Sequence, residues 1–277
     1  MRSMLMSGVA IAALAPTVLL AQSHDAHTAH AAAAPRTITL TYTDYSFADM
    51  PDTVPAGMIT LRGVNEGKEP HQAMVVRLAD GHTADELMRA LQIPGPPPSW
   101  MHIEGGPQVG ADVMLNLGPG QYVLLCMIPS PDGTPHAMKG MVRPFTVVPS
   151  SAAAESPPVV DLEMTMANYD WTMTKPLSAG KNVIKVTTAP GQPHEFVIAH
   201  LLPGKGAKDI AAWEQNMSGG PPPFDFITGN APLEAGVTNY LTVDLKPGRY
   251  ALVCFIPDAT DGKSHLAHGM IREVVVR

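Results

Sequence analysis

The side chains best suited to chemistry in this chain form a set that is present twice. Residues 118–141 and 246–270 each contain a Cys at the end of an apolar run, a turn-rich loop, a His, and a Met five residues after that His. One further His stands 55 positions before the first Cys and 60 before the second. Two imidazoles, one thiolate and one weakly bound thioether are the ligands of blue copper centres. This inventory predicts two copper-binding β-domains.

The composition limits the class of protein. The chain has 277 residues, 45% of them hydrophobic and 16% charged, which is enough for one large or two ordinary domains. Its 28 Pro and 24 Gly favour many turns and short strands over long helices. The formal net charge is −7 and no basic patch is present, which argues against a nucleic-acid partner.

The first 21 residues have the pattern of a secretory signal peptide. Arg2 supplies a positive charge, residues 4–20 are almost wholly apolar, and Ala21 is a small residue at the expected cleavage point. An uncleaved membrane anchor is the alternative, but Pro16 and the short apolar span argue against it. We therefore expect a periplasmic or secreted protein with no membrane span after signal removal.

Export leaves two interpretations of the two cysteines. An oxidising compartment favours a disulfide between Cys126 and Cys254. Each Cys, however, ends an equivalent apolar run in its own half of the chain and has its own His and Met nearby. That arrangement favours two separate metal sites over one disulfide.

Residues 22–35, QSHDAHTAHAAAAP, predict a flexible tail because they are polar, rich in Ala and without apolar periodicity. The tail contains His24, His27 and His30. Cleavage after Ala21 would make His24 the third residue, where its imidazole, two amide nitrogens and a free amine chelate Cu(II) in a square plane. A solvated tail without metal is the interpretation that we favour, and cyclisation of Gln22 would also remove the amine.

The two halves of the chain repeat one another along their whole length. The offsets between equivalent residues stay between 123 and 129: His71 and His194, Tyr45 and Tyr169, Cys126 and Cys254, Met141 and Met270. Such an offset indicates a domain duplication and not a solenoid, whose period would be shorter.

Each half is predicted to be an all-β unit with one short helix. Segments with alternating apolar residues predict strands. A capping box at residues 83–86 and the segment 209–217 predict the helices. We expect domain 1 at residues 36–148, a Pro- and Ala-rich linker at 149–158, and domain 2 at 159–277, each a β-sandwich.

The pattern Tyr-x-x-x-Cys-x-x-Pro followed by His-x-x-x-Gly-Met, with a Pro-His pair upstream, resembles the cupredoxins, the superfamily of plastocyanin and azurin. The resemblance covers both halves almost end to end and implies two tandem Greek-key β-sandwich domains. The residues that carry it are Pro70, His71, Tyr122, Cys126, Pro129, His136, Gly140 and Met141 in the first half, and Pro193, His194, Tyr250, Cys254, Pro257, His265, Gly269 and Met270 in the second.

By that resemblance the chain holds up to two type 1 (blue) coppers. The implied ligands are His71, Cys126, His136 and Met141 for the first, and His194, Cys254, His265 and Met270 for the second. One departure from the family is that nine and ten residues separate Cys from His, more than is usual, which predicts a less preorganised loop. Auxiliary copper ligands are proposed among His24, His27, His30, His268 and Met138.

The resemblance implies electron transfer with a redox partner protein. Copper oxidases and nitrite reductases also have tandem cupredoxin domains, but the His-x-His and His-Cys-His motifs that hold their further copper are absent from this sequence. We therefore expect no enzymatic activity and assign no catalytic residue. A periplasmic copper buffer or chaperone, supported by the tail histidines, and a metal-free β-sandwich binding module are the alternatives.

Overall fold

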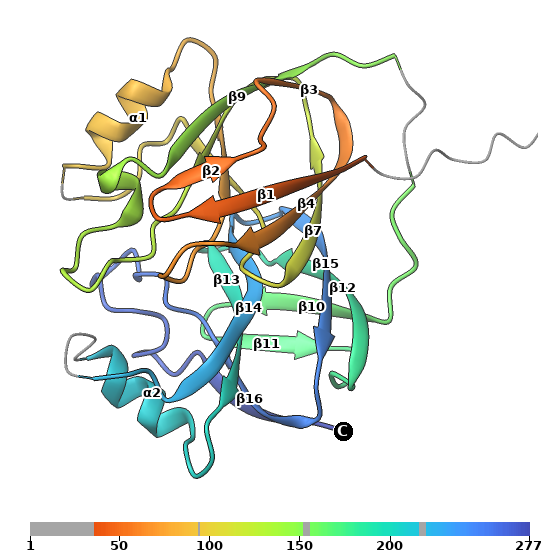
Figure 1. Cartoon of the computed structure of the whole chain (residues 1–277), viewed down its shortest axis with the longest axis vertical. Coiled ribbons are helices and arrows are strands. Elements are labelled where there is room, and N and C mark those ends of the chain that lie inside the picture. The colour runs from red at the N-terminus through yellow and green to blue at the C-terminus, as the bar shows by residue number, and fades with distance from the viewer. Residues whose placement is uncertain (1–35, 94, 152–155, 216–219) are drawn as a thin grey trace, which may run out of the picture. The chain divides into compact units, whose positions relative to one another are not determined.

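Strands dominate the computed structural model, which describes residues 36–93, 95–151, 156–215 and 220–277 (Figure 1). The predicted signal peptide, the tail with its three histidines and part of the predicted linker lie outside these ranges. The strands form two sheets, and two short α-helices accompany them. The predicted all-β class is confirmed. Within the described ranges no helix is both long and apolar enough to cross a membrane.

The first repeat, residues 36–148, contains nine strands, one α-helix and one short 3-10 helix. In chain order they are β1 (Arg36–Thr43), β2 (Ser46–Ala48), β3 (Thr53–Pro55), β4 (Gly57–Asn65), β5 (Met74–Leu78), α1 (Ala84–Ala90), β6 (Met101–Gly105), β7 (Ala111–Leu117), β8 (Gly120–Leu125), η1 (His136–Lys139) and β9 (Val142–Val148).

The described residues of 159–277 follow the same order of elements, except that β3 and η1 have no counterpart among them. They form β10 (Leu162–Ala167), β11 (Asp170–Met173), β12 (Gly180–Thr188), β13 (His194–Leu201), α2 (Ala207–Glu214), β14 (Phe224–Leu233), β15 (Thr238–Leu245), β16 (Gly248–Val253) and β17 (Ile271–Val276).

Both sheets run through both repeats. One has the order β11-β10-β12-β15-β7-β4-β1-β2 and the other β17-β16-β13-β14-β6-β5-β8-β9-β3. The repeats join where equivalent strands pair antiparallel, β7 with β15 and β6 with β14. Val113 lies opposite Leu241, its own counterpart, while Asp112 lies opposite Thr242 and Met114 opposite Tyr240. This reciprocal register is that of a two-fold interface within one chain.

In the sheet that contains β8 and β16, these two strands are buried on both faces over their last four residues. The inner face of the sheet packs into the main core, whereas its outer face is covered by Leu87 of α1 in the first repeat and by Ile210 of α2 in the second. A strand buried on both faces is a continuous apolar run instead of an alternating one. This explains the runs YVLL and YALV that precede the two cysteines.

The α1 helix starts at the predicted capping box. Thr83 Oγ1 accepts a hydrogen bond from the Glu86 amide at 3.2 Å, and Glu86 Oε2 accepts one from the Thr83 amide at 2.9 Å. These two bonds give hydrogen-bond acceptors to backbone amides that would otherwise have none at the start of a helix. The predicted second helix is also present, two residues earlier than expected.

We predict that the two repeats unfold together. Leu241 is fully buried at the centre of the shared sheet, so Leu241→Ala should lower the free energy of unfolding by about 2–5 kcal/mol. Urea denaturation followed by circular dichroism should show one transition in the wild type and in the variant. Val275→Ala, at a side chain that is 55% exposed, is the control and should change stability by less than about 0.5 kcal/mol. Two separate transitions, of which only one moves, would contradict the prediction.

Candidate metal centres

Each Cys lies where a strand that is buried on both faces ends. Cys126 follows β8 and Cys254 follows β16, and both side chains are fully buried. Both thiols are free, so the structure does not contain the disulfide that was the alternative interpretation. Each thiol lies instead beside the histidines of its own repeat.

The long loops between Cys and His are closed at their bases. In the first repeat Pro129 and Pro135 form a β-bridge, and the His136 amide donates to the Ile128 carbonyl at 3.0 Å. In the second repeat Pro257 bridges Ser264, and the His265 amide donates to the Ile256 carbonyl at 2.8 Å. The extra residues therefore form a loop whose two ends are bonded to each other, and the His at its end lies close to the Cys. These backbone bonds favour a preorganised loop despite its length.

A glycine after each His turns the chain back toward the Cys. Gly140 has φ 107° and Gly269 has φ 94°, in the left-handed region that favours glycine. The turn lets the Met141 amide donate to the His136 carbonyl at 2.9 Å, and the Met141 carbonyl accepts from the Cys126 amide at 3.3 Å. Met270 makes the same two backbone bonds in the second repeat. Both methionines are fully buried in the core that also contains the cysteines.

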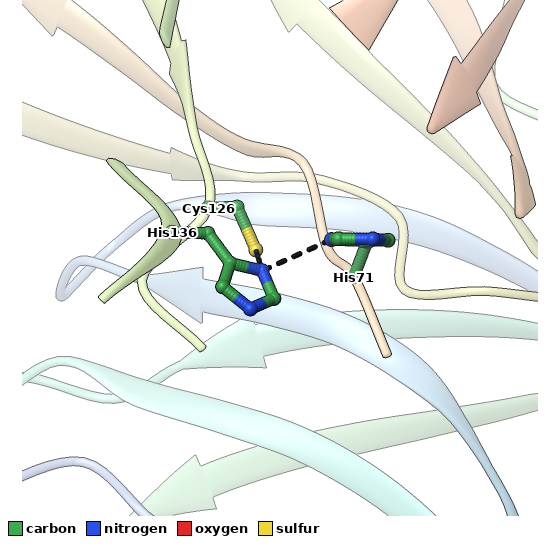
Figure 2. Close-up of side chains that lie close together, drawn as sticks. All are labelled: His71, Cys126 and His136. Atoms are coloured by element: carbon green, nitrogen blue, oxygen red, sulfur yellow. Dashed lines mark hydrogen bonds between the residues drawn. The ribbon is translucent and has the colours of Figure 1, made fainter. Parts of the chain in front are cut away.

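In the first repeat three ligand-type atoms meet in a buried place. His71 Nδ1 lies 3.0 Å from His136 Nδ1, and Cys126 Sγ lies 3.4 Å from His136 Nδ1. Figure 2 shows one nitrogen of the His136 ring joined by dashed lines to the Cys126 sulfur and to the His71 ring. These residues come from the loop before β5, the end of β8 and the start of η1, so only the folded chain brings them together.

Two carboxylates determine which nitrogens of these rings carry protons. His71 Nε2 lies 3.1 Å from Asp44 Oδ1, and His136 Nε2 lies 2.8 Å from Glu69 Oε2. A carboxylate accepts hydrogen bonds, so both Nε2 atoms are assigned as donors, and in the neutral rings both Nδ1 atoms then carry lone pairs. Burial, partly offset by Asp44, lowers the pKa of His71, which favours the neutral ring.

The facing lone pairs make this a site for a cation. Two unprotonated Nδ1 atoms 3.0 Å apart repel one another unless a proton or a metal ion lies between them. A thiol beside them completes a His2Cys set, which together with a weak Met ligand is the donor set preferred by copper in electron-transfer sites. The residues present therefore fit copper.

The second repeat reproduces the same geometry. His194 Nδ1 lies 3.0 Å from His265 Nδ1, and Cys254 Sγ lies 3.4 Å from His265 Nδ1 and 4.0 Å from His194 Nδ1. Burial, with a smaller effect of His265, lowers the pKa of His194 to about 4. Burial also lowers the pKa of His265. Both rings are therefore available as neutral ligands at pH 7.

Burial keeps both thiols protonated while no metal is bound. It raises the pKa of Cys126 to about 11, although the amides of Gln72 and Ile128 act in the opposite direction. For Cys254, burial and then the neighbouring Glu195 carboxyl raise the pKa further. The Glu195 amide lies 3.5 Å from Cys254 Sγ, as a donor to it. Since the thiolate is the ligand, a metal must displace one proton at each site.

The auxiliary candidates within the described ranges lie elsewhere. His268 Nε2 is 3.1 Å from Asp261 Oδ1 and its ring stacks on Tyr169, so it belongs to a group with Asp258 and Asp261. The oxygens of Asp258 already accept hydrogen bonds from Thr260, Tyr169 and Gln192. Met138 is half-buried against the cluster that contains Leu125.

Sequence reasoning missed the carboxylates that contact the histidines. Asp44 stands next to Tyr45 in the repeated aromatic motif, and Glu69 stands two residues before His71. Their positions gave a weak signal, because neither acid recurs in the second repeat, where Asn168 and Gln192 stand at the equivalent positions.

Several solved structures are similar to this chain at low sequence identity. Auracyanin B is 19% identical over 44% of this chain and 93% of its own, with a TM-score of 0.29. A copper-containing nitrite reductase from Thermus scotoductus is 12% identical over 88% of this chain and 62% of its own, with a TM-score of 0.24. The McoA multicopper oxidase of Aquifex aeolicus is 12% identical over 88% of this chain and 66% of its own, with a TM-score of 0.27. No family model and no curated protein matches the sequence.

The all-β class follows from the two sheets of this chain, which both halves of the chain share. The expectation that it is not an enzyme was wrong, because nitrite reductase and multicopper oxidases, which are enzymes, stand among the similar structures. The absence of His-x-His and His-Cys-His motifs does not exclude an enzymatic activity, and we withdraw that expectation.

The burial of both thiols predicts their reactivity. In the metal-free folded protein at pH 8, Cys126 and Cys254 should react slowly with an aromatic disulfide reagent, because both are buried and protonated. In guanidinium chloride two thiols per chain should react within minutes. A protein that releases no thiol even after unfolding would contain the disulfide and contradict the prediction.

Proposed function

We propose that the protein is an exported electron-transfer protein that binds one copper ion in each of its two repeats. The proposed repeats are residues 36–148 and 159–277, and the proposed export signal is residues 1–21. The proposed ligands are His71, Cys126, His136 and Met141 in the first site, and His194, Cys254, His265 and Met270 in the second. A soluble redox partner protein is the expected electron donor or acceptor.

The observation that carries the proposal is the meeting of two imidazole Nδ1 atoms and one Cys sulfur in each repeat. The distances are equal in the two repeats, 3.0 Å between the nitrogens and 3.4 Å from sulfur to the second His. Buried polar groups normally pair with one another, whereas these donor atoms pair properly only through a cation. A chance cluster in a core would not recur with the same distances.

The protein's part in electron transfer is to hold the donor atoms still. Copper supplies a one-electron couple when bound, and a His2Cys set with a weak Met suits both of its oxidation states. Three ligands of each site are held by the closed loop and its backbone bonds, and the fourth by the loop or strand next to the buried sheet. A rigid set of this kind limits the rearrangement that would oppose electron transfer.

The first test is to add Cu(II) to the purified mature protein and to record its visible absorption, its electron paramagnetic resonance and its copper content. We expect two coppers per chain and an intense charge-transfer band from thiolate to copper. Cys126→Ser and Cys254→Ser should each leave one copper and about half of the band, and the double variant should lose the band. Copper without that band would favour a buffer, and a folded protein that binds no copper would overturn the proposal.

The pKa of the thiols predicts how binding depends on pH. In Cys254→Ser, which keeps only the first site, the pKa of Cys126 of about 11 means that binding expels one proton throughout the neutral range. The thiol is protonated in the free protein and ionised in the complex, so raising the pH favours the complex. The apparent copper affinity should rise about tenfold per pH unit between pH 6 and 8. Calorimetry in buffers of different ionisation enthalpy should count about one proton, and no proton release would contradict the assignment of Cys126 as a ligand.

A further inference from the structure

The two sites differ in the groups that contact the outer edges of their ligand histidines. In the first repeat a carboxylate contacts each ring, Asp44 Oδ1 at 3.1 Å from His71 Nε2 and Glu69 Oε2 at 2.8 Å from His136 Nε2. We call Asp44 and Glu69 the carboxylate clamp. Both rings are fully buried, so solvent does not compete for these hydrogen bonds.

The clamp is itself fixed by other groups. Asp44 accepts hydrogen bonds from the Lys68 amide at 2.9 Å and the Glu69 amide at 3.2 Å, and these amides, Lys68 first, lower its pKa. Glu69 Oε1 accepts from the Tyr45 hydroxyl at 2.9 Å. Burial alone would raise the pKa of Glu69, but the hydrogen bonds from His136, Tyr45 and Ser130 outweigh it and lower that pKa. Both clamp residues are therefore anionic at neutral pH.

The second repeat lacks this clamp. Asn168, a neutral residue, stands at the position of Asp44, and Gln192 stands at the position of Glu69. The carboxylate that takes over from Glu69 comes from the other side of the site: Asp258, four residues after Cys254, where the first repeat has Ser130. Asp258 Oδ2 accepts from the Tyr169 hydroxyl at 2.5 Å, as Glu69 does from Tyr45.

Asp258 does not reach the ligand histidine as Glu69 does. Its Oδ2 lies 3.8 Å from His265 Nε2, beyond hydrogen-bond distance, and that nitrogen is buried without a hydrogen-bond partner among the described residues. Asp258 instead accepts hydrogen bonds from Tyr169, Gln192 and Thr260, and these bonds stabilise its negative charge. Among the described residues, therefore, no carboxylate oxygen lies within hydrogen-bond distance of His265 Nε2.

We propose that Asp44 and Glu69 are positioning residues that give the first copper site a lower reduction potential than the second. A carboxylate that accepts the Nε2 proton makes an imidazole a more basic ligand and fixes its orientation. A more basic ligand set and two nearby negative charges favour Cu(II) over Cu(I), because Cu(II) carries the larger charge. This inference rests on the proposed function, since it presupposes copper at both sites.

One carboxyl group near the second site acts in the opposite direction whenever it is ionised, and it therefore enters the test. Glu195, next to His194, is buried, and its Oε1 accepts from the Phe255 amide at 2.7 Å. The first repeat has the neutral Gln72 at this position. Glu195→Gln places the same neutral side chain at this position in both halves of the chain. A difference in reduction potential that remains then does not come from Glu195.

The test compares proteins that keep a single site. Cys254→Ser keeps the first site, and Cys126→Ser with Glu195→Gln keeps the second. Spectroelectrochemical titration of each copper-loaded protein should give a lower potential for the first site. In the first-site protein, Asp44→Asn and Glu69→Gln should each raise the potential and weaken Cu(II) binding by about 10- to 100-fold. In the second-site protein, Asn168→Asp should lower the potential.

Two further measurements separate a role in positioning from a loss of structure. Asp52→Asn removes a carboxylate that pairs with Arg143 away from the site, and it should leave the potential unchanged. In the metal-free protein, nitrogen-15 NMR of the imidazoles should find a proton on Nε2 of both His71 and His136. If either Nε2 atom carries no proton in the metal-free protein, the assigned hydrogen bond to Asp44 or Glu69 is wrong. This result would overturn the inference whether or not the protein binds copper.

The outcomes distinguish this inference from the proposed function. Copper bound at both sites with equal or reversed potentials, or a first-site potential that Asp44→Asn and Glu69→Gln leave unchanged, would overturn the inference alone. A protein that binds no copper at either site would overturn the proposed function and this inference together.

Discussion

Each site depends on three buried donor atoms that cannot satisfy one another. Two imidazole nitrogens and a thiol meet where no solvent reaches them, and in the first repeat the Nε2 protons are already used by carboxylates. A buried polar group without a partner is costly, so the fold must hold this arrangement against its tendency to separate. The buried strands and the closed loops hold the three groups together, and the proposed copper ion would supply the missing partner.

The similar order of strands in the two halves of the chain gives one chain two such groups of side chains. The repeats do not stand as separate sandwiches, because β6 pairs with β14 and β7 with β15, so that each sheet passes from one repeat to the other. Val113 opposite Leu241 marks the centre of this internal two-fold relation. Joining equivalent strand edges also covers hydrogen-bonding groups that would be exposed in each repeat alone.

The repeats have kept the ligands and changed their surroundings. The carboxylate that bonds the tyrosine beside each site is Glu69 in one half of the chain and Asp258 in the other. Glu69 precedes Cys126 in the sequence, whereas Asp258 follows Cys254. The exchange preserves the bond to the tyrosine but moves the charge by about an ångström relative to the imidazole. The basicity of an imidazole ligand depends strongly on the group that accepts its hydrogen bond. A small displacement of that carboxylate therefore changes how strongly the imidazole binds a metal.

The sequence by itself determined the all-β class, the duplication and the grouping of His, Cys and Met, because strand alternation and a nearly constant repeat offset are local or one-dimensional properties. It also predicted the capping box of α1, which depends on four consecutive residues. Only the tertiary structure decided that the long loops close at Pro129 and Pro257, that the sheets are shared, and that Asp44 and Glu69 contact the ligand rings. Those contacts join residues 27 and 67 positions apart, and such long-range pairs depend on the packing of the whole core and not on any local pattern.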